Sequence, residues 1–306
     1  FIGFQNDTIH VSSKNQQLDI VLRDGVELNE VNIVTRKLGT MKLRSSVMNE
    51  DMISSAELSR AACCNLGESF VTNPSVDVSY SDAATGAKQI KLLGLSGTYV
   101  QMLTENIPNY RGAAAPYGLG YVPGPWMQSI QVSKGTSSVK NGYEAITGQI
   151  NVEFKKPQLP EADWVSANLF ASTTNRYEAN ADATLKISKR WSTSLLAHYE
   201  NETKAHDGND DGFVDIPQVE QYNVWNRWAY MGDHYVFQAG IKALSETRTS
   251  GQANHGGTMH SGDLYKVGID TERYEFFTKN AYIFNKEKNT NLALILSTTL
   301  HNQDAT

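Results

Sequence analysis

The stretch YEANADATLKIS, residues 177–188, alternates apolar and polar side chains with a period of two. On an extended chain, one face would carry Tyr177, Ala179, Ala181, Ala183, Leu185 and Ile187, and the polar residues between them would lie on the other face. The same alternation returns in WSTSLLAHYE (191–200) and HYVFQAGIKAL (234–244). It predicts β-strands that are apolar on one side only, and about twice the usual length of five or six residues.

Two architectures accommodate such strands: a soluble sandwich or barrel with a packed core, and a transmembrane barrel that is apolar outside and polar inside. Three details favour the membrane. The polar face carries full charges, aromatic residues stand at strand ends, and tight turns alternate with the long polar segments 203–221 and 246–262. We therefore predict a mainly β chain with an antiparallel transmembrane β-barrel, and a soluble β-domain is the alternative.

The composition and the residue patterns argue against several classes of function. The 306 residues carry a net charge of −6 with both signs mixed and no basic patch, which argues against a nucleic-acid partner. No apolar run approaches the 18 residues of a membrane-spanning helix. The order of Ser, His and Asp residues indicates no nucleophile–base pair, so we do not expect an enzyme. The chain begins at Phe1 without a visible signal peptide, and we expect a processed or cut start.

A segment rich in small residues, GTSSVKNGYEAITGQINVEFKKP (135–157), precedes the alternating strands. With the preceding SIQVSK, it resembles the end of the plug domain of TonB-dependent outer-membrane receptors. The matching residues are Ile130, Val132, Gly135, Ser137, Gly142, Tyr143, Ala145, Gly148, Ile150, Asn151, Val152, Lys156 and Pro157. The order NGYEA departs from the usual pattern, and Thr147 stands where a second small residue is common. A glycine-rich surface loop is the alternative interpretation.

The resemblance extends along the chain and implies its organisation. Residues 1–25 are similar to the last strands of a carboxypeptidase-regulatory-like extension, as in Bacteroidota receptors, and residues 26–39 would form the linker that contains the TonB box. Residues 40–157 would be an α+β plug domain, with one helix expected over 48–73, and residues 158–306 the first, incomplete part of a barrel of about 22 strands. The box itself would comprise Leu28, Asn29, Glu30, Val31, Asn32, Ile33 and Val34.

The family resemblance also implies a mechanism and partners. A scarce ligand would bind at the extracellular mouth, and the TonB protein with its inner-membrane motor would pair with the box as an added strand and displace part of the plug. The outer membrane of a Gram-negative, Bacteroidota-type bacterium would surround the barrel. The residues expected at the ligand-facing apex of the plug are Tyr99, Met102, Tyr110, Tyr117, Tyr121 and Trp126.

The sequence leaves the ligand class open. We expect import of a metal chelate, such as a ferric siderophore, haem or cobalamin, or of a metal ion. The alternative is import of a glycan or peptide together with a surface lipoprotein, and a structural or secretion-associated barrel is a third, weaker possibility. The aromatic residues expected at the apex of the plug are compatible with a glycan.

Two loops and a cysteine pair have the chemistry of metal sites. Asp207, Asn209, Asp211, Gly212 and Asp215 match positions 1, 3, 5, 6 and 9 of a calcium loop, but Gln218 replaces the usual glutamate at position 12, so calcium would bind weakly. His255, Met259 and His260 suit a transition metal. Each loop could equally be a solvated surface turn. Cys63 and Cys64 are simplest as small buried side chains, with a disulfide or soft-metal site as the alternative.

Overall fold

The computed structural model describes residues 40–42, 49–60, 64–71, 73–95, 97–137, 141–157, 165–253, 264–285, 288 and 290–306. The chain divides into two compact units, Phe1–Lys37 and Leu38–Thr306, and every described residue belongs to the second. The predicted extension, the TonB box, the histidine–methionine group and Cys63 therefore lie outside the described residues. Within the described part, no helix is both long and apolar enough to span a membrane.

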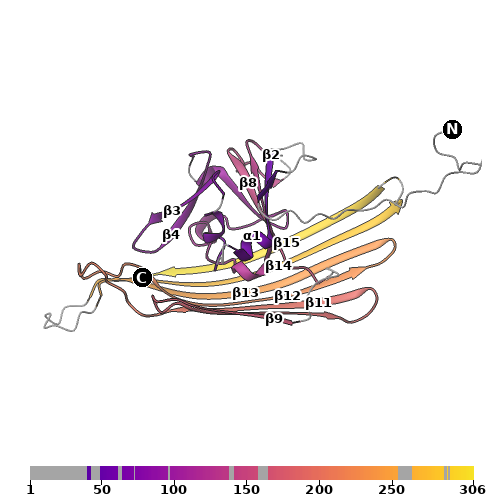
Figure 1. Cartoon of the computed structure of the whole chain (residues 1–306). Coiled ribbons are helices and arrows are strands. Elements are labelled where there is room, and N and C mark those ends of the chain that lie inside the picture. Colours follow the sequence, from indigo (N-terminus) through magenta and orange to yellow (C-terminus); the bar gives the residue numbers. More distant parts are fainter. Residues whose placement is uncertain are drawn as a thin grey trace, which may run out of the picture. The chain divides into compact units, whose positions relative to one another are not determined.

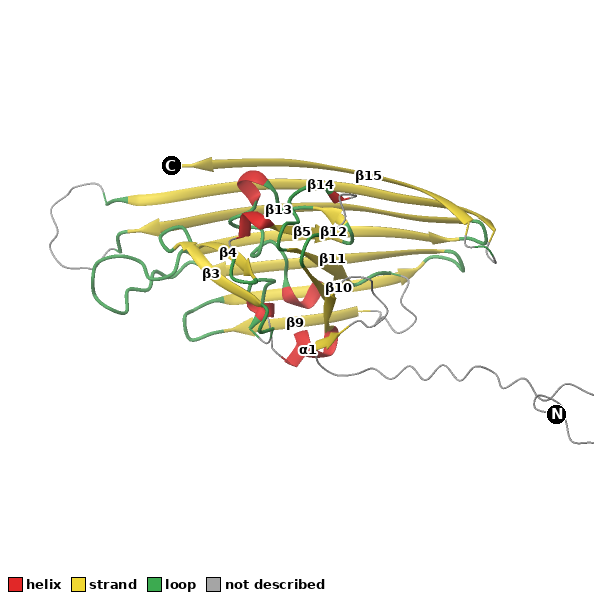
Figure 2. Cartoon of the chain, turned by 90° about the horizontal axis from the view of Figure 1, so that it is seen from above, coloured by secondary structure: helices red, strands yellow, loops and turns green. Residues whose placement is uncertain are grey.

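Seven antiparallel strands form the larger sheet and follow one another in chain order (Figure 2). They are β9 (Val165–Ala171), β10 (Tyr177–Lys186), β11 (Trp191–Glu202), β12 (Gln218–Met231), β13 (Tyr235–Gly251), β14 (Lys266–Asn285) and β15 (Thr290–Ala305). Short connections, 187–190, 232–234 and 286–289, join the strands at one end. Longer connections, 203–217 and 252–265, join them at the other end, which we call the long-loop end. The predicted strands and their number of about seven are thus confirmed for the described part of the chain. The predicted loops are shorter than expected, because 218–221 and 246–251 belong to β12 and β13, and the short connection 172–176 lies at the long-loop end.

The two faces of this sheet have the polarity expected of a transmembrane barrel. Many apolar and aromatic side chains are exposed on the outer face, and they include Leu185, Leu195, Val224, Trp228, Ile241, Tyr274 and Phe276. Charged and amide side chains are buried on the inner face, among them Glu178, Asn180, Glu200, Asn223, Arg227, Lys242 and Arg273. A water-soluble domain shows the opposite arrangement. An apolar outer face and a polar inner face are typical of strands that pass through lipid.

The remaining elements form a plug that lies over one face of the seven-stranded sheet (Figure 1). Its six-stranded sheet has the order β1-β2-β7-β8-β5-β6, and β3 and β4 form a separate hairpin. The strands are β1 (Thr40–Lys42), β2 (Asn49–Ser54), β3 (Val76–Asp82), β4 (Ala87–Leu92), β5 (Val100–Thr104), β6 (Ile107–Pro108), β7 (Met127–Lys134) and β8 (Gly148–Phe154). The helices are α1 (Ser55–Arg60) and the 3-10 turns η1 (Glu68–Phe70), η2 (Gly97–Tyr99), η3 (Gly112–Ala114) and η4 (Gly124–Trp126).

The plug core lies where β2, β7 and β8 pair. Ile53, Ile130 and Val152 are fully buried there, and Ile53 pairs with Ile130, which in turn pairs with Val152. The single helix expected over 48–73 is wrong: residues 49–54 form a strand, and of the residues described in this range only Ser55–Arg60 are α-helical. Pairing of β2 with β7 satisfies its backbone groups and buries Ile53, so tertiary packing overrides the local helical preference.

Gly148, the first residue of β8, shows why the segment 135–157 needs small residues. Its φ is +156°, and a Cβ atom there would collide with the carbonyl oxygen of Ser133 on β7 and with the Leu92 side chain. Only glycine permits this approach of two neighbouring backbones. Gly135, at the end of β7, has a φ of +88° and begins the intervening turn. These glycines let the chain return beside β7 before it leaves the plug.

Candidate ligand and transport site

A tight turn between β5 and β6 anchors the plug to the inner face of the larger sheet. Glu105 and Asn106 adopt left-handed conformations in this turn, with φ of +50° and +62°. The Glu105 carboxylate lies 2.6 Å from the Arg227 guanidinium of β12 and 3.4 Å from the Lys279 ammonium of β14. Arg227 also donates to the Lys155 carbonyl at 2.7 Å, just after β8. One plug carboxylate therefore links two barrel strands and the exit of the plug.

Burial and neighbouring charges act in opposite directions on the pKa of the Glu105 carboxyl. Burial alone would raise the pKa of this carboxyl, but the positive charges of Arg227, Lys279 and Lys156 hold its pKa below the ordinary value. The side chain therefore remains ionised at neutral pH although it is 3 % exposed. A buried pair of this kind is strongly destabilised when one partner is removed.

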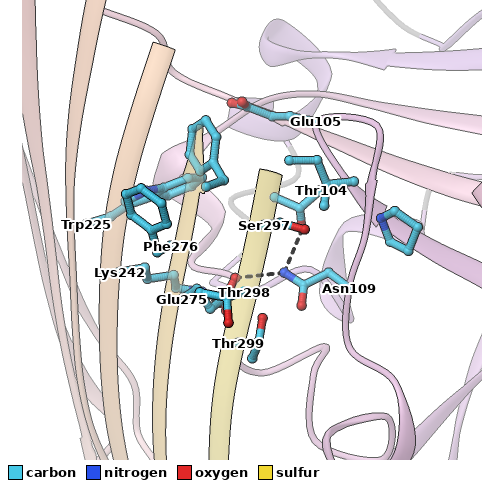
Figure 3. Close-up of a pocket in the computed structure, with 13 residues that line it drawn as sticks. Thr104, Glu105, Asn109, Trp225, Lys242, Glu275, Phe276, Ser297, Thr298 and Thr299 are labelled. Carbon is cyan, nitrogen blue, oxygen red and sulfur yellow. Dashed lines mark hydrogen bonds and ion pairs between the residues drawn. The ribbon is translucent and has the colours of Figure 1, made fainter. Parts of the chain in front are cut away.

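Asn109, shortly after this turn, extends the anchor to β14 (Figure 3). Its amide nitrogen donates to Glu275 at 2.8 Å and to Thr104 at 3.3 Å. Lys242 of β13 lies nearby, 3.3 Å from the Tyr110 hydroxyl. The space that these residues surround has a volume of about 40 Å³. Ligand pockets have volumes of roughly 300–1,000 Å³, so this space suits water rather than a ligand.

A larger cavity opens at the long-loop end, and we call it the mouth cavity. Its volume is about 300 Å³, within the range of ligand pockets. The plug contributes residues of 64–68, 80–88 and 116–120, and the larger sheet contributes the ends of β9, β11, β12 and β13 together with residues 172–176 and 216–217. The ionisable side chains that line it are Cys64, Glu68, Tyr80, Lys88, Tyr117, Arg176, Glu200, Glu202, Glu246 and Arg248.

Ion pairs across the mouth cavity join the plug to the strands. Arg176, just before β10, lies 2.9 Å from Glu68 of the plug and 3.0 Å from Glu200 of β11. It also contacts Glu178 at 2.7 Å. Arg248 of β13 pairs with Glu246 at 3.0 Å and donates to the Thr85 carbonyl of the plug at 3.4 Å. Most of the charged side chains of this cavity are thus engaged in ion pairs, and Arg176 is shared among three carboxylates.

The six residues predicted for the plug apex differ in how far they are buried in the structure. Tyr117 lines the mouth cavity, Tyr99 is 42 % exposed, and Met102 is partly buried, and a ligand contact at these three residues stays a prediction. Tyr110, Tyr121 and Trp126 are 5 %, 0 % and 0 % exposed, because they pack between the plug and the inner face of the sheet. The prediction that these three belong to an exposed apex is therefore wrong. Further barrel strands would only add to their burial.

The predicted calcium loop is ordered by its own backbone in this structure. The Asp207 carboxylate accepts hydrogen bonds from the N–H groups of Asp211 and Gly212, and Asp215 accepts one from Gly208. Gly212 has a φ of +85°, which is the sharp turn predicted for it. Within the described ranges, no group of three or more His, Cys, Asp or Glu side chains is arranged to hold a metal ion. Calcium at this loop stays a prediction.

Cys64 is 7 % exposed in the plug, and its backbone N–H donates to Glu68 at 3.0 Å. Burial and the neighbouring Glu178 and Glu68 carboxylates raise the pKa of its thiol, so the sulfur stays protonated. The thiol is free of a disulfide. Cys64 therefore fits the expectation of a small buried side chain.

Comparisons with known proteins agree with this arrangement. Residues 42–149 match the family model of the TonB-dependent Receptor Plug Domain, within the 40–157 predicted from sequence. The chain is similar to the vitamin B12 transporter BtuB of Vibrio vulnificus (strain CMCP6), with 24% identity over 185 residues, which cover 60% of this chain and 30% of the relative.

Solved structures of receptors share the fold. The ferripyoverdine receptor of the outer membrane of Pseudomonas aeruginosa matches 87% of this chain and 35% of its own, with a TM-score of 0.67 and 14% identity. The closed form of the ferric-catecholate import receptor Fiu from E. coli K12 matches 89% of this chain and 40% of its own, with a TM-score of 0.66 and 16% identity. The chain thus spans about a third of the length of these proteins.

Proposed function

Because the chain carries the plug domain and the first barrel strands of a TonB-dependent receptor, we propose that the whole protein imports a scarce metal chelate across the outer membrane of a Gram-negative bacterium. Ferric siderophores, haem and cobalamin are the chelates considered, and a metal ion is a further cargo of the same class. The observation that carries the proposal is the plug that lies against the polar face of a sheet whose other face is apolar.

The relatives support the choice of cargo. One is named as a vitamin B12 transporter, and the structural neighbours are described as receptors for ferric catecholates and ferripyoverdine. They are transporters and receptors rather than enzymes, in agreement with the sequence-based expectation. The mouth cavity, at the long-loop end between plug and barrel, has the size of a ligand pocket.

In the proposed cycle, the ligand binds at the long-loop end, and TonB pairs with residues 28–34 as an added strand. Force on this segment then displaces part of the plug. The plug faces the sheet through polar contacts such as Lys242 with the Tyr121 carbonyl, at 3.1 Å, and Asn223 with the same oxygen, at 3.0 Å. Water can replace such hydrogen bonds at small net cost, so a polar interface favours reversible movement.

A surface lipoprotein partner, a Bacteroidota-type host and glycan or peptide import remain predictions from the sequence. Growth of a strain in which the gene is deleted would separate the cargo classes. We expect the deletion to slow growth when a ferric siderophore, haem or cobalamin is the sole limiting source of its metal or vitamin, and the intact gene to restore growth. Normal growth on all three, with loss of growth on a glycan or peptide, would replace the proposal by its alternative.

A further inference from the structure

Two charged side chains in the mouth cavity have no ion-pair partner among the residues described. Glu68 and Glu200 both contact Arg176, which they share with Glu178, and Glu246 contacts Arg248. Once these pairs are formed, one carboxylate, Glu202, and one ammonium, Lys88, remain from the charged lining. Among the described charged residues of the lining, Glu202 and Lys88 are therefore the two that a ligand could contact without displacing an ion pair.

Glu202 is the last residue of β11 and is 7 % exposed. The described structure gives its carboxylate one hydrogen bond, a long one of 3.3 Å from the Thr174 hydroxyl. An ionised carboxylate has two oxygens and about four acceptor positions. Burial without a cation is costly for such a group, so a ligand cation or N–H donor would stabilise it.

Lys88 lies in β4 of the plug and contributes the other charge. Its backbone N–H donates to the Pro116 carbonyl at 2.8 Å, which fixes the residue at the cavity wall. Its ammonium is 5.5 Å from the centre of the Tyr80 ring. Burial lowers the pKa of Lys88, with Glu68 opposing the effect and the nearby arginines adding to it. A ligand carboxylate would supply the counter-ion that this ammonium lacks.

Gln221 of β12 adds an acceptor to the same lining. Its amide nitrogen is committed to Glu246 at 2.7 Å and to the Gly120 carbonyl at 3.3 Å. Its amide oxygen has no hydrogen-bond partner in the described structure, although the residue is 1 % exposed. The cavity thus presents unsatisfied acceptors at Glu202 and Gln221 and a donor at Lys88.

We propose that the mouth cavity binds a zwitterionic group, with the ligand's ammonium at Glu202 and its carboxylate at Lys88. A ligand with only one charge would leave one of the two protein groups without a counter-ion, and a neutral ligand would leave both. This proposal rests on the proposed import function, because it names the ligand chemistry of the same mouth. The zwitterion can be an amino-acid arm of a metal chelate or a free peptide.

Binding to the purified full-length receptor in detergent tests the proposal. The peptide probes are triglycine, N-acetyltriglycine and triglycinamide. The chelate probes are an iron(III) tris-hydroxamate with a free α-amino-acid arm and the same chelate with that amine acetylated. We expect at least one zwitterionic probe to bind about tenfold more tightly than its capped forms, as the loss of one charge-assisted hydrogen bond implies.

The set of probes that binds identifies the source of the zwitterion. Binding of the free-arm chelate but not of triglycine points to a chelate cargo, and the reverse points to a peptide. Equal binding of zwitterionic and capped probes, or no binding of any of them, would overturn the proposal. The assay needs neither TonB nor energy, so its failure would leave the import function to be judged by the growth test.

Two substitutions assign the charges to their residues. Glu202→Gln should remove the preference for the free amine, and Lys88→Met the preference for the free carboxylate, each by about tenfold. Glu220→Gln, on the outer face of β12, and Lys186→Met, at the end of β10, are matched controls that should change neither preference. Outer-membrane abundance and heat-modifiability on gels confirm folding. An unchanged preference in both folded cavity variants would contradict the assignment.

Discussion

Glu105 joins the plug to two strands of the larger sheet, and its partner Arg227 is 3 % exposed. Glu105→Ala would leave that guanidinium buried without its carboxylate, and we expect a loss of about 3–5 kcal/mol in the stability of the anchored plug. Hydrogen exchange of residues 100–108 in the full-length receptor measures the loss. Asp233→Ala, which removes the exposed partner of Arg190, should leave this exchange unchanged. Equal protection in both variants would show that the anchor contributes nothing.

The ionisation of Glu105 should make the stability of the anchored plug depend on pH. The pKa of Glu105 is lowered in the folded plug, so its stabilising contribution is complete above the ordinary value of 4.5 and is lost as the pH falls through the lower folded-state pKa. We expect constant protection of residues 100–108 from pH 7 to about pH 4.5, and declining protection below it. The difference between wild type and Glu105→Gln isolates this group, because the other carboxylates titrate in both. A difference that grows as the pH rises above neutrality would refute the assignment.

Positions along the outer face of the larger sheet should differ in how well they tolerate a charged side chain. Leu195 is 46 % exposed on the outer face of β11, and Leu195→Arg should cost about 2–4 kcal/mol if the position lies near the bilayer midplane. Leu185→Arg, next to the turn at 187–190, should cost about 0–1 kcal/mol because it lies near the interface. Folding titrations into lipid vesicles compare the two. Similar small costs at both positions would argue against a lipid-facing surface.

Side chains of the inner face show what the alternation of apolar and polar residues cannot predict. By the alternation alone, Ser194 and Asn180 belong to the polar face, where an Arg is expected to be tolerated. These side chains are only 5 % and 4 % exposed, because the plug covers them, so an Arg there would overpack the interface. Periodicity predicts which face a residue occupies, but it does not predict what packs against that face.

The plug sheet was less predictable than the barrel strands for a physical reason. Barrel neighbours follow one another in the chain, so local alternation and turn lengths determine their pairing. In the plug, β2 pairs with β7 and β5 runs parallel to β8, and each pair joins segments separated by many residues. Glu202 and Lys88 were also missed, because an isolated charge in a strand looks like part of a solvated face until the cavity around it is known.

The loop between β11 and β12 carries the predicted calcium site. In this structure, backbone N–H groups occupy oxygens of Asp207 and Asp215, so a calcium ion would compete with these weak contacts. We expect binding near 10⁻⁴–10⁻³ M, as in extracellular modules, because Gln218 replaces the usual bidentate glutamate. Calcium should then slow proteolysis of residues 203–217 in the full receptor. Protection that persists in the Asp207→Ala, Asp211→Ala double variant would exclude the site.

At the scale of the whole molecule, the plug and the strands form one unit whose interface combines buried polar groups with an apolar cluster that includes Leu196, Trp225 and Leu244 of the sheet. In the polar part of this interface, Lys242, Asn223 and Arg227 all donate hydrogen bonds to plug backbone carbonyls. These contacts fix the position of the plug, yet each can be exchanged for water at a small net cost. An interface of this kind is suited to a domain that must stay in place and then move under force.

A substitution in the predicted TonB box should abolish transport and leave ligand binding unchanged. Residues 28–34 are predicted to pair with TonB as a strand, and a proline removes one backbone donor and hinders strand pairing. Val31→Pro should therefore abolish uptake of a labelled chelate by cells, whereas ligand binding by the purified receptor should match wild type. Val31→Ala keeps the backbone donor and is the matched control, with near-normal uptake expected. Uptake that survives Val31→Pro, in a receptor of normal outer-membrane abundance, would place the TonB-binding segment elsewhere in the chain.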